Sequence, residues 1–289
     1  MNKRSLLRLA ASAFCFSTIV ALVTTWAYAG GPLILVNGKP VTWPQNPSML
    51  PVLGGPQNLE TVDAQGNVLY RVDAGTLGPL SNQQATAIVD HIFQQYSSIP
   101  TSTIRLKNAG SIVDPITGQP GVDVTSKNAG EFLGNTATFN NAIIFDSRGN
   151  IIGDPLILGE FGTRVIDPSG FQEEGFVMLN GNSLTQNIVS TTSFIGVFQH
   201  EFGHFVGPLD HEQINGIVGD TRLAPAGFTA GQAFDLFAPF TETLYPFIYG
   251  APSGSQLGAQ FPDSGFFIAT LDMDTQNAVS NLYPTPGYL

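Results

Sequence analysis

The most regular hydrophobic pattern of the chain lies in residues 191–207. Apolar side chains occupy nearly every side of a helix there: Phe194, Ile195, Val197, Phe198, Phe202, Phe205 and Val206. A helix that is apolar almost all round is buried. Thr192 or Ser193 is the expected N-cap, and Gly207 is the expected end because glycine tolerates the left-handed conformation that reverses the chain.

Shorter patterns predict a sheet before this helix. Apolar or alternating runs predict strands at 68–72, 103–106 and 175–179, and a hairpin of 142–145 with 151–152 across the polar turn 146–150. With the helices described next, the expected order along the chain is strand, helix, strands, helix.

Two further helices are expected on either side of this region. The sequence Ser81-Asn82-Gln83-Gln84 is a capping box, and apolar residues recur after it at helical spacing as far as Tyr96. His91 lies off that apolar face and is expected to be an ordinary surface histidine. Asp272 is expected to cap a last helix that ends before Pro284.

Residues 1–29 have the features of a cleavable signal peptide. Three basic residues within the first eight positions precede the apolar stretch 9–23, and Ala-Tyr-Ala at 27–29 is a small-x-small cleavage site. We expect a mature chain that starts at Gly30, keeps no stable membrane anchor and is secreted to the periplasm or the extracellular space. The proline-rich segment 30–60 is expected to be an extended arm, either a propeptide or a strap, ahead of one domain at 61–289.

Charge and cysteine content narrow the possible partners. Without the three basic residues of the leader, 8 Lys and Arg face 22 Asp and Glu, a formal charge of −14. A nucleic-acid partner is excluded, since phosphate binding needs clustered cations. The one cysteine, Cys15, lies in the leader. The mature chain therefore has no disulfide and no propeptide thiolate that could block a metal.

Three ionisable side chains lie in the second half of the predicted buried helix: His200, Glu201 and His204. The two histidines are one turn apart, so both rings project from the same face and can bind one metal ion. Glu201 lies beside them, where a carboxylate can take a proton from a water on that metal. Because H-E-x-x-H also occurs in helices that bind no metal, the residues that follow it matter.

With those residues, the segment 200–211 resembles the zinc motif of the matrixin-like metzincin metallopeptidases, H-E-x-x-H-x-x-G-x-x-H followed by a Met-turn. Gly207 matches the motif glycine. Residues 242–246 (Glu-Thr-Leu-Tyr-Pro) resemble the Met-turn, with Leu244 in place of the methionine and a similar apolar volume. The resemblance covers about 68–283 and implies a metzincin-like α+β catalytic domain. Its features are a twisted mixed β-sheet, a buried active-site helix and a C-terminal helix.

Two neighbouring residues, Asp210 and His211, are candidates for the third zinc ligand. Counted from His200, the position of the family's third histidine falls on Asp210, and His211 follows one residue later, as if Pro208 were inserted. We expect His211 to bind, because Leu-Asp-His at 209–211 resembles the family's own ending. Asp210 is the alternative, as an oxygen ligand. The expected zinc ligands are His200, His204 and His211, and the expected catalytic residue is Glu201.

The resemblance implies a zinc-dependent endopeptidase that acts on protein or peptide substrates. The substrate would bind as an added strand along an edge strand, for which 154–162 is the candidate. Pro208 and Leu244 also fit an alternative, a catalytically inactive metzincin-like binding protein. Near the candidate edge, Asp146, Asn150 and Asp154 offer oxygen ligands for a structural Ca²⁺, and an acidic turn is the alternative. The number of subunits is left open.

Overall fold

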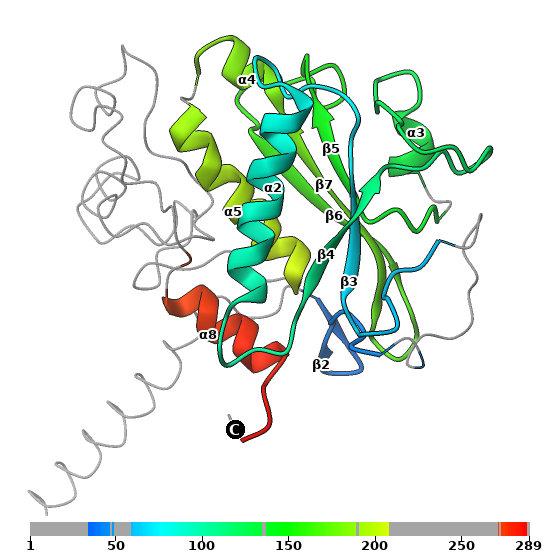
Figure 1. The fold of residues 1–289 in the computed structure, drawn as a ribbon, viewed down its shortest axis with the longest axis vertical. Coiled ribbons are helices and arrows are strands. Elements are labelled where there is room, and N and C mark those ends of the chain that lie inside the picture. Colours follow the sequence, from blue (N-terminus) through cyan, green and yellow to red (C-terminus); the bar gives the residue numbers. More distant parts are fainter. Residues whose placement is uncertain are drawn as a thin grey trace, which may run out of the picture.

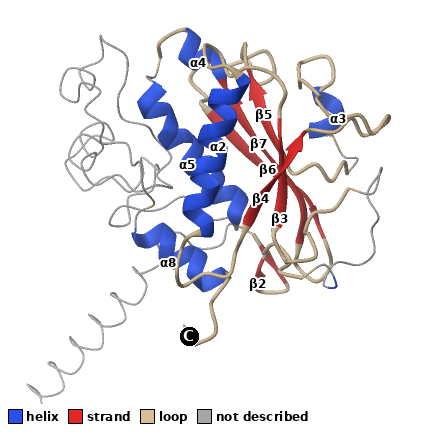
Figure 2. Cartoon of the chain, in the orientation of Figure 1, coloured by secondary structure: helices blue, strands red, loops and turns tan. Residues whose placement is uncertain are grey.

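The computed structural model describes residues 34–46, 48, 59–134, 137–188, 191–207, 271 and 273–287. These residues form a five-stranded mixed sheet with helices packed on both of its faces (Figures 1 and 2). The α+β class implied by the resemblance is compatible with this architecture. The expected signal peptide, 1–29, lies outside the described residues.

The sheet has the strand order β4-β3-β5-β7-β6. Its strands are β3 (Val68–Val72), β4 (Leu106–Ser111), β5 (Ala142–Asp146), β6 (Gly159–Ile166) and β7 (Gln172–Asn180). The pairs β3–β4, β3–β5 and β5–β7 are parallel, and β6 pairs antiparallel with β7. Strand β6 is therefore an edge strand, and it contains the second half of the expected edge 154–162.

Three helices cover one face of this sheet. They are α2 (Asn82–Ser97), α5 (Thr191–Val206) and α8 (Met273–Leu282). Their apolar side chains share a core with alternate residues of the central strands, among them Val72, Phe145 and Leu179. The short helix α3 (Ala129–Leu133) packs on the other face, where a smaller core includes Phe132, Ile144 and Met178. A second short helix, α4 (Gly181–Thr185), follows β7 and leads towards α5.

Several sequence predictions are confirmed. The predicted strands 68–72 and 175–179 lie in β3 and β7. Both halves of the capping box form at the start of α2, where the side chain of Ser81 accepts from the backbone N–H of Gln84 and the Gln84 side chain accepts from that of Ser81. Helix α8 ends at Leu282, before Pro284. Its expected cap, Asp272, lies outside the described residues.

The predicted strand 103–106 is wrong in its limits, because the strand begins at Leu106 where the prediction ends. The backbone N–H of Thr103 donates instead to the carbonyl of Tyr283 at 2.7 Å. The true strand has the sequence Leu-Lys-Asn-Ala-Gly-Ser at the sheet edge, with no buried residue in it. A half-exposed edge strand therefore had no apolar pattern by which to recognise it.

The predicted hairpin of 142–145 with 151–152 is also wrong. Residues 142–146 form a strand, but it pairs in parallel with β3 and β7. The carboxylate of Asp146 accepts the backbone N–H groups of Asn150, Ile151 and Ile152, each at 2.9 Å. This turn occupies the donors that a returning strand would have needed.

The described part of the N-terminal arm lies across the domain. It begins with a two-stranded hairpin of β1 (Leu35–Val36) and β2 (Lys39–Pro40). The backbone N–H of Gln172, at the start of β7, donates to the carbonyl of Thr42. Trp43 is fully buried in the main core, where its ring lies 5.0 Å from that of Phe205. The proline-rich pattern predicted an extended arm but gave no sign of this anchor.

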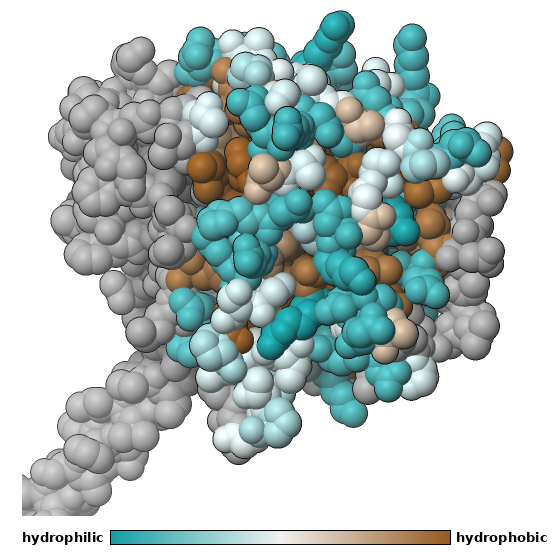
Figure 3. All heavy atoms as spheres, in the orientation of Figure 1, coloured by the Kyte–Doolittle hydropathy of each residue, from teal (hydrophilic) through white to brown (hydrophobic). Residues whose placement is uncertain are grey.

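On the face that α2 crosses, hydrophilic and neutral side chains predominate, and apolar ones show between them (Figure 3). The large hydrophobic side chains that are exposed among the described residues are Leu35, Ile116, Leu156 and Ile157. A membrane-spanning helix, long and apolar enough to cross a bilayer, was not found in the part of the chain that the structure describes.

Candidate metal centre and peptidase site

Helix α5 holds the three site residues that the sequence predicted. It starts at Thr191, so the expected caps Thr192 and Ser193 lie inside its first turn, and that prediction of the cap is wrong. The side of α5 opposite the histidines packs against α2, where the ring of Phe202 stacks on that of Phe93 at a centroid distance of 4.1 Å. This contact orients the helix so that its histidines lie away from α2.

The structure brings His200 and His204 together. Their Nε2 atoms are 3.1 Å apart and hydrogen-bonded, and the two rings are nearly perpendicular at an interplanar angle of 87°. Two nitrogen ligands at about 2.0–2.1 Å from a tetrahedral zinc ion lie roughly 3.3 Å from each other. The spacing and the chemistry of this pair therefore fit a shared zinc ion.

Glu201 lies on the same stretch of helix and is buried, with 7% of its surface exposed. Burial, together with the smaller effect of the negative charge of Glu160, raises the pKa of its carboxyl group to about 8. A divalent cation at the neighbouring histidines would oppose this shift, because it favours the ionised carboxylate. The structure thus places a buried carboxyl group with a raised pKa directly after His200 on the helix.

Edge strand β6 runs alongside this part of α5. Gly159 lies against Glu201, and the ring of Phe161 stacks on that of His204 at a centroid distance of 6.1 Å. The two strand residues are two apart, so they share one face of the strand. Both residues lie within the expected edge 154–162, but neither was predicted individually as part of the site. Alternation along an edge strand beside the H-E-x-x-H helix was the signal that could have identified them.

The rest of the predicted zinc site lies outside the described residues. Asp210 and His211, the two candidates for the third ligand, lie there. So do Pro208 and the turn that contains Leu244. Within the described ranges, no group of three or more His, Cys, Asp or Glu side chains is arranged to hold a metal ion. His91 is exposed, as expected, and lies 3.2 Å from the side-chain nitrogen of Gln95.

The candidate calcium ligands form an acidic turn. Asp146 uses both carboxylate oxygens to accept backbone N–H groups of residues 150–152, and Asp154 accepts from the N–H of Leu156 at 2.9 Å. Asn150 is exposed. Of the two interpretations of these residues, the hydrogen bonds favour the turn.

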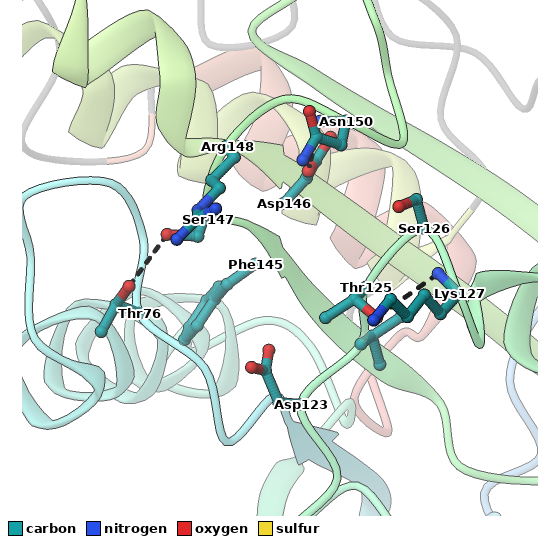
Figure 4. Close-up of a pocket in the computed structure, with 11 residues that line it drawn as sticks. Thr76, Asp123, Thr125, Ser126, Lys127, Phe145, Asp146, Ser147, Arg148 and Asn150 are labelled. Carbon is teal, nitrogen blue, oxygen red and sulfur yellow. Dashed lines mark hydrogen bonds between the residues drawn. The ribbon is translucent and has the colours of Figure 1, made fainter.

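A separate hollow of about 470 Å³ lies where β3 and β5 end (Figure 4). The chain leaves β3 towards β4 on one side and leaves β5 towards β6 and β7 on the other, so this is the point of a parallel sheet where ligands commonly bind. Its lining includes two cationic side chains, Lys127 and Arg148, and two carboxylates, Asp123 and Asp146. No histidine lines it. With both signs of charge present, the lining favours no single class of ligand.

Comparison of the chain with protein-family models, with curated proteins and with solved structures found no match.

Proposed function

We propose that this protein is a zinc-dependent endopeptidase of the matrixin-like metzincin type. The observation that carries the proposal is the group formed by one helix, in which two imidazole Nε2 atoms 3.1 Å apart adjoin a buried glutamate. The mixed sheet with an antiparallel edge strand beside that helix supports the same type of fold. In this proposal His211 completes the ligand set, and Asp210 is its alternative.

Zinc, when bound, would polarise the peptide carbonyl and make a water molecule more acidic. The chain's own contribution is the movement of one proton. Glu201, as carboxylate, accepts the proton of the attacking water and then donates it to the departing amine. His200 and His204, whose Nε2 atoms face each other, would hold the metal as neutral imidazoles. Phe161, stacked on His204, covers one side of that ring and restricts its orientation.

A peptide substrate would bind in extended form along β6. Within the described sheet the outer edge of β6 has no partner strand, and in this proposal the substrate pairs with that edge. A strand added there would pass next to Gly159, and hence next to Glu201. Main-chain pairing alone distinguishes few sequences, so this geometry suits a protease that cleaves extended, unstructured chains.

Cleavage of casein by the zinc-loaded protein tests the proposal. Glu201→Gln keeps the shape of the side chain but removes the base, and we expect it to reduce kcat by about 10²–10⁴-fold. His200→Ala should abolish activity, whereas His91→Ala, which removes an exposed histidine, should leave it unchanged. Equal and negligible cleavage by the wild type and Glu201→Gln would overturn the proposal in favour of a non-catalytic binding protein.

We also propose that the leader directs this peptidase out of the cytoplasm. The basic start, the apolar stretch 9–23 and the Ala-Tyr-Ala site support this. N-terminal sequencing of the exported chain should find Gly30 as the first residue. An exported chain that retains residues 1–29 would contradict cleavage at that site.

A further inference from the structure

Gly159, the first residue of β6, occupies the space next to the carboxyl group of Glu201. A Cβ atom built on Gly159 would lie 2.7 Å from Cγ, 2.8 Å from Oε1 and 3.0 Å from Cδ of Glu201. These are the three atoms nearest to that position. We infer that Gly159 is a positioning residue for Glu201, because the missing side chain leaves the space in which the glutamate lies.

The backbone gives no other reason for glycine at this position. Gly159 is not among the described glycines with positive φ, so an L-residue can adopt its conformation. It pairs with Leu179 of β7, whose side chain belongs to the core on the α5 side of the sheet. A side chain at position 159 would therefore point towards α5. The conflict with Glu201 is steric and specific to that residue.

Glu201 cannot avoid this conflict by a small movement of its end. The closest atom is Cγ, whose position is set by χ1, so the whole side chain would have to change rotamer. Glu201 is 7% exposed and lies between Phe202 and His200 on a buried helix, which leaves little room for a second rotamer. An alanine at position 159 would thus displace the carboxylate from its present position.

The consequence for catalysis rests on the proposed function. Displacement of a catalytic group by about 1 Å can lower the rate by up to about 100-fold. We expect Gly159→Ala to lower kcat strongly with a small effect on KM, since alanine preserves the strand backbone to which the substrate would pair. The zinc content of the variant should equal that of the wild type, because the three atoms nearest to a Cβ at position 159 all belong to Glu201 and none to a histidine.

The contact itself is tested without any assay of activity. Gly159→Ala is introduced into three backgrounds: wild-type Glu201, Glu201→Gln and Glu201→Ala. The Tm of each metal-free protein is compared with that of the same background with Gly159. With Glu201, or with Glu201→Gln, which has the same shape, Gly159→Ala should lower Tm by at least about 3 °C. With Glu201→Ala the same change should raise Tm by about 1–4 °C, because glycine weakens a strand. Gly130→Ala is the control, since a Cβ at Gly130 meets nothing within 4 Å.

The outcomes separate this inference from the proposed function. A Tm effect of Gly159→Ala that is the same in all three backgrounds would overturn the inference even if the wild type cleaves casein. Full activity of Gly159→Ala in an active enzyme would overturn it as well. If the wild type is inactive but the Tm effect changes sign with Glu201→Ala, the steric contact holds and only the proposed catalytic role falls.

Discussion

The indole Nε1 of Trp43 donates a hydrogen bond of 2.6 Å to the backbone carbonyl of Phe205, in the last turn of α5. The hydroxyl of Tyr283 donates to the next carbonyl, that of Val206, at 2.7 Å and accepts from the backbone N–H of Trp43 at 2.9 Å. The last carbonyls of a helix lack partners within it. Residues from the N-terminal arm and from the segment after α8 thus cap the helix that carries the histidines.

Replacement of Trp43 should therefore destabilise the protein strongly. Trp43→Ala removes a fully buried aromatic side chain, and we expect a loss of about 3–5 kcal/mol in the free energy of unfolding. Trp43→Phe keeps most of the volume and should cost about 1–3 kcal/mol, because the Phe205 carbonyl loses its partner. Urea denaturation measures both. Leu35→Ala, in the same arm but 57% exposed, is the control. A Trp43→Ala protein as stable as this control would show that the arm is not anchored.

The buried ion pair between Arg164 and Glu174 should be sensitive to the loss of one partner. Arg164 Nη1 lies 2.7 Å from Glu174 Oε1, and the two side chains are 5% and 2% exposed. Arg164→Leu leaves a buried carboxylate without its counter-charge, which typically costs 3–5 kcal/mol. Lys107→Ala breaks the other ion pair of the described residues, whose lysine is 56% exposed, and should cost less than about 1 kcal/mol. Similar losses in the two variants would contradict the prediction.

The buried carboxyl group of Asp73 should make stability depend on pH. Burial raises the pKa of Asp73 from 3.8 to about 7, although backbone N–H groups of Gly75, Phe145 and Val124 favour the carboxylate. A raised pKa in the folded state means that the folded protein binds the proton more tightly than the unfolded one. The contribution of Asp73 to stability is thus fully present below pH 3.8 and is lost as the pH rises through about 7.

Denaturation of metal-free protein between pH 4 and 8 measures this effect. Glu201→Gln is used as the background, because the pKa of Glu201 is also raised, to about 8. Adding Asp73→Asn should flatten the fall of stability with pH. Glu131→Gln, which removes an exposed carboxylate, should leave the slope unchanged. An equal slope with and without Asp73 would refute the assignment.

Removal of metal should lower the thermal stability if the two histidines bind zinc. A ligand at 100 times its Kd stabilises the folded state by about 2.7 kcal/mol, and a chelator removes that contribution. We expect the Tm of the wild type and of His91→Ala to fall after chelation and to recover with zinc. The Tm of His200→Ala and of His204→Ala should not respond. A wild-type Tm indifferent to zinc would count against a metal centre.

Buried, regular elements were predicted well from the sequence. The apolar pattern of α5 and the capping box of α2 predicted both helices. The continuous apolar run of 175–179 predicted β7, because its side chains pack in the cores on both faces of the sheet. The pair His200 and His204 followed from helical periodicity alone. Local pattern suffices where the same face of an element is buried along its whole length.

Features that depend on distant contacts were missed. Edge strand β4 has no buried residue, so no apolar pattern in the sequence marks where it begins and ends. The false hairpin arose because Ile151 and Ile152 are apolar, whereas their backbone donors are taken by Asp146. Trp43 resembled any other residue of a proline-rich arm. The partner of Glu201, Gly159, has no side chain whose chemistry could have pointed to it.

The capping of α5 sets an order of events in folding. Trp43 is separated from Phe205 by 162 residues and from Tyr283 by 240. Contacts between such distant parts of a chain form late and slow the search for the native state. The hydrogen bond that caps the Val206 carbonyl of α5 can form only after Tyr283 has been synthesised. A partial chain that stops before Tyr283 therefore lacks the hydroxyl group that caps this end of α5.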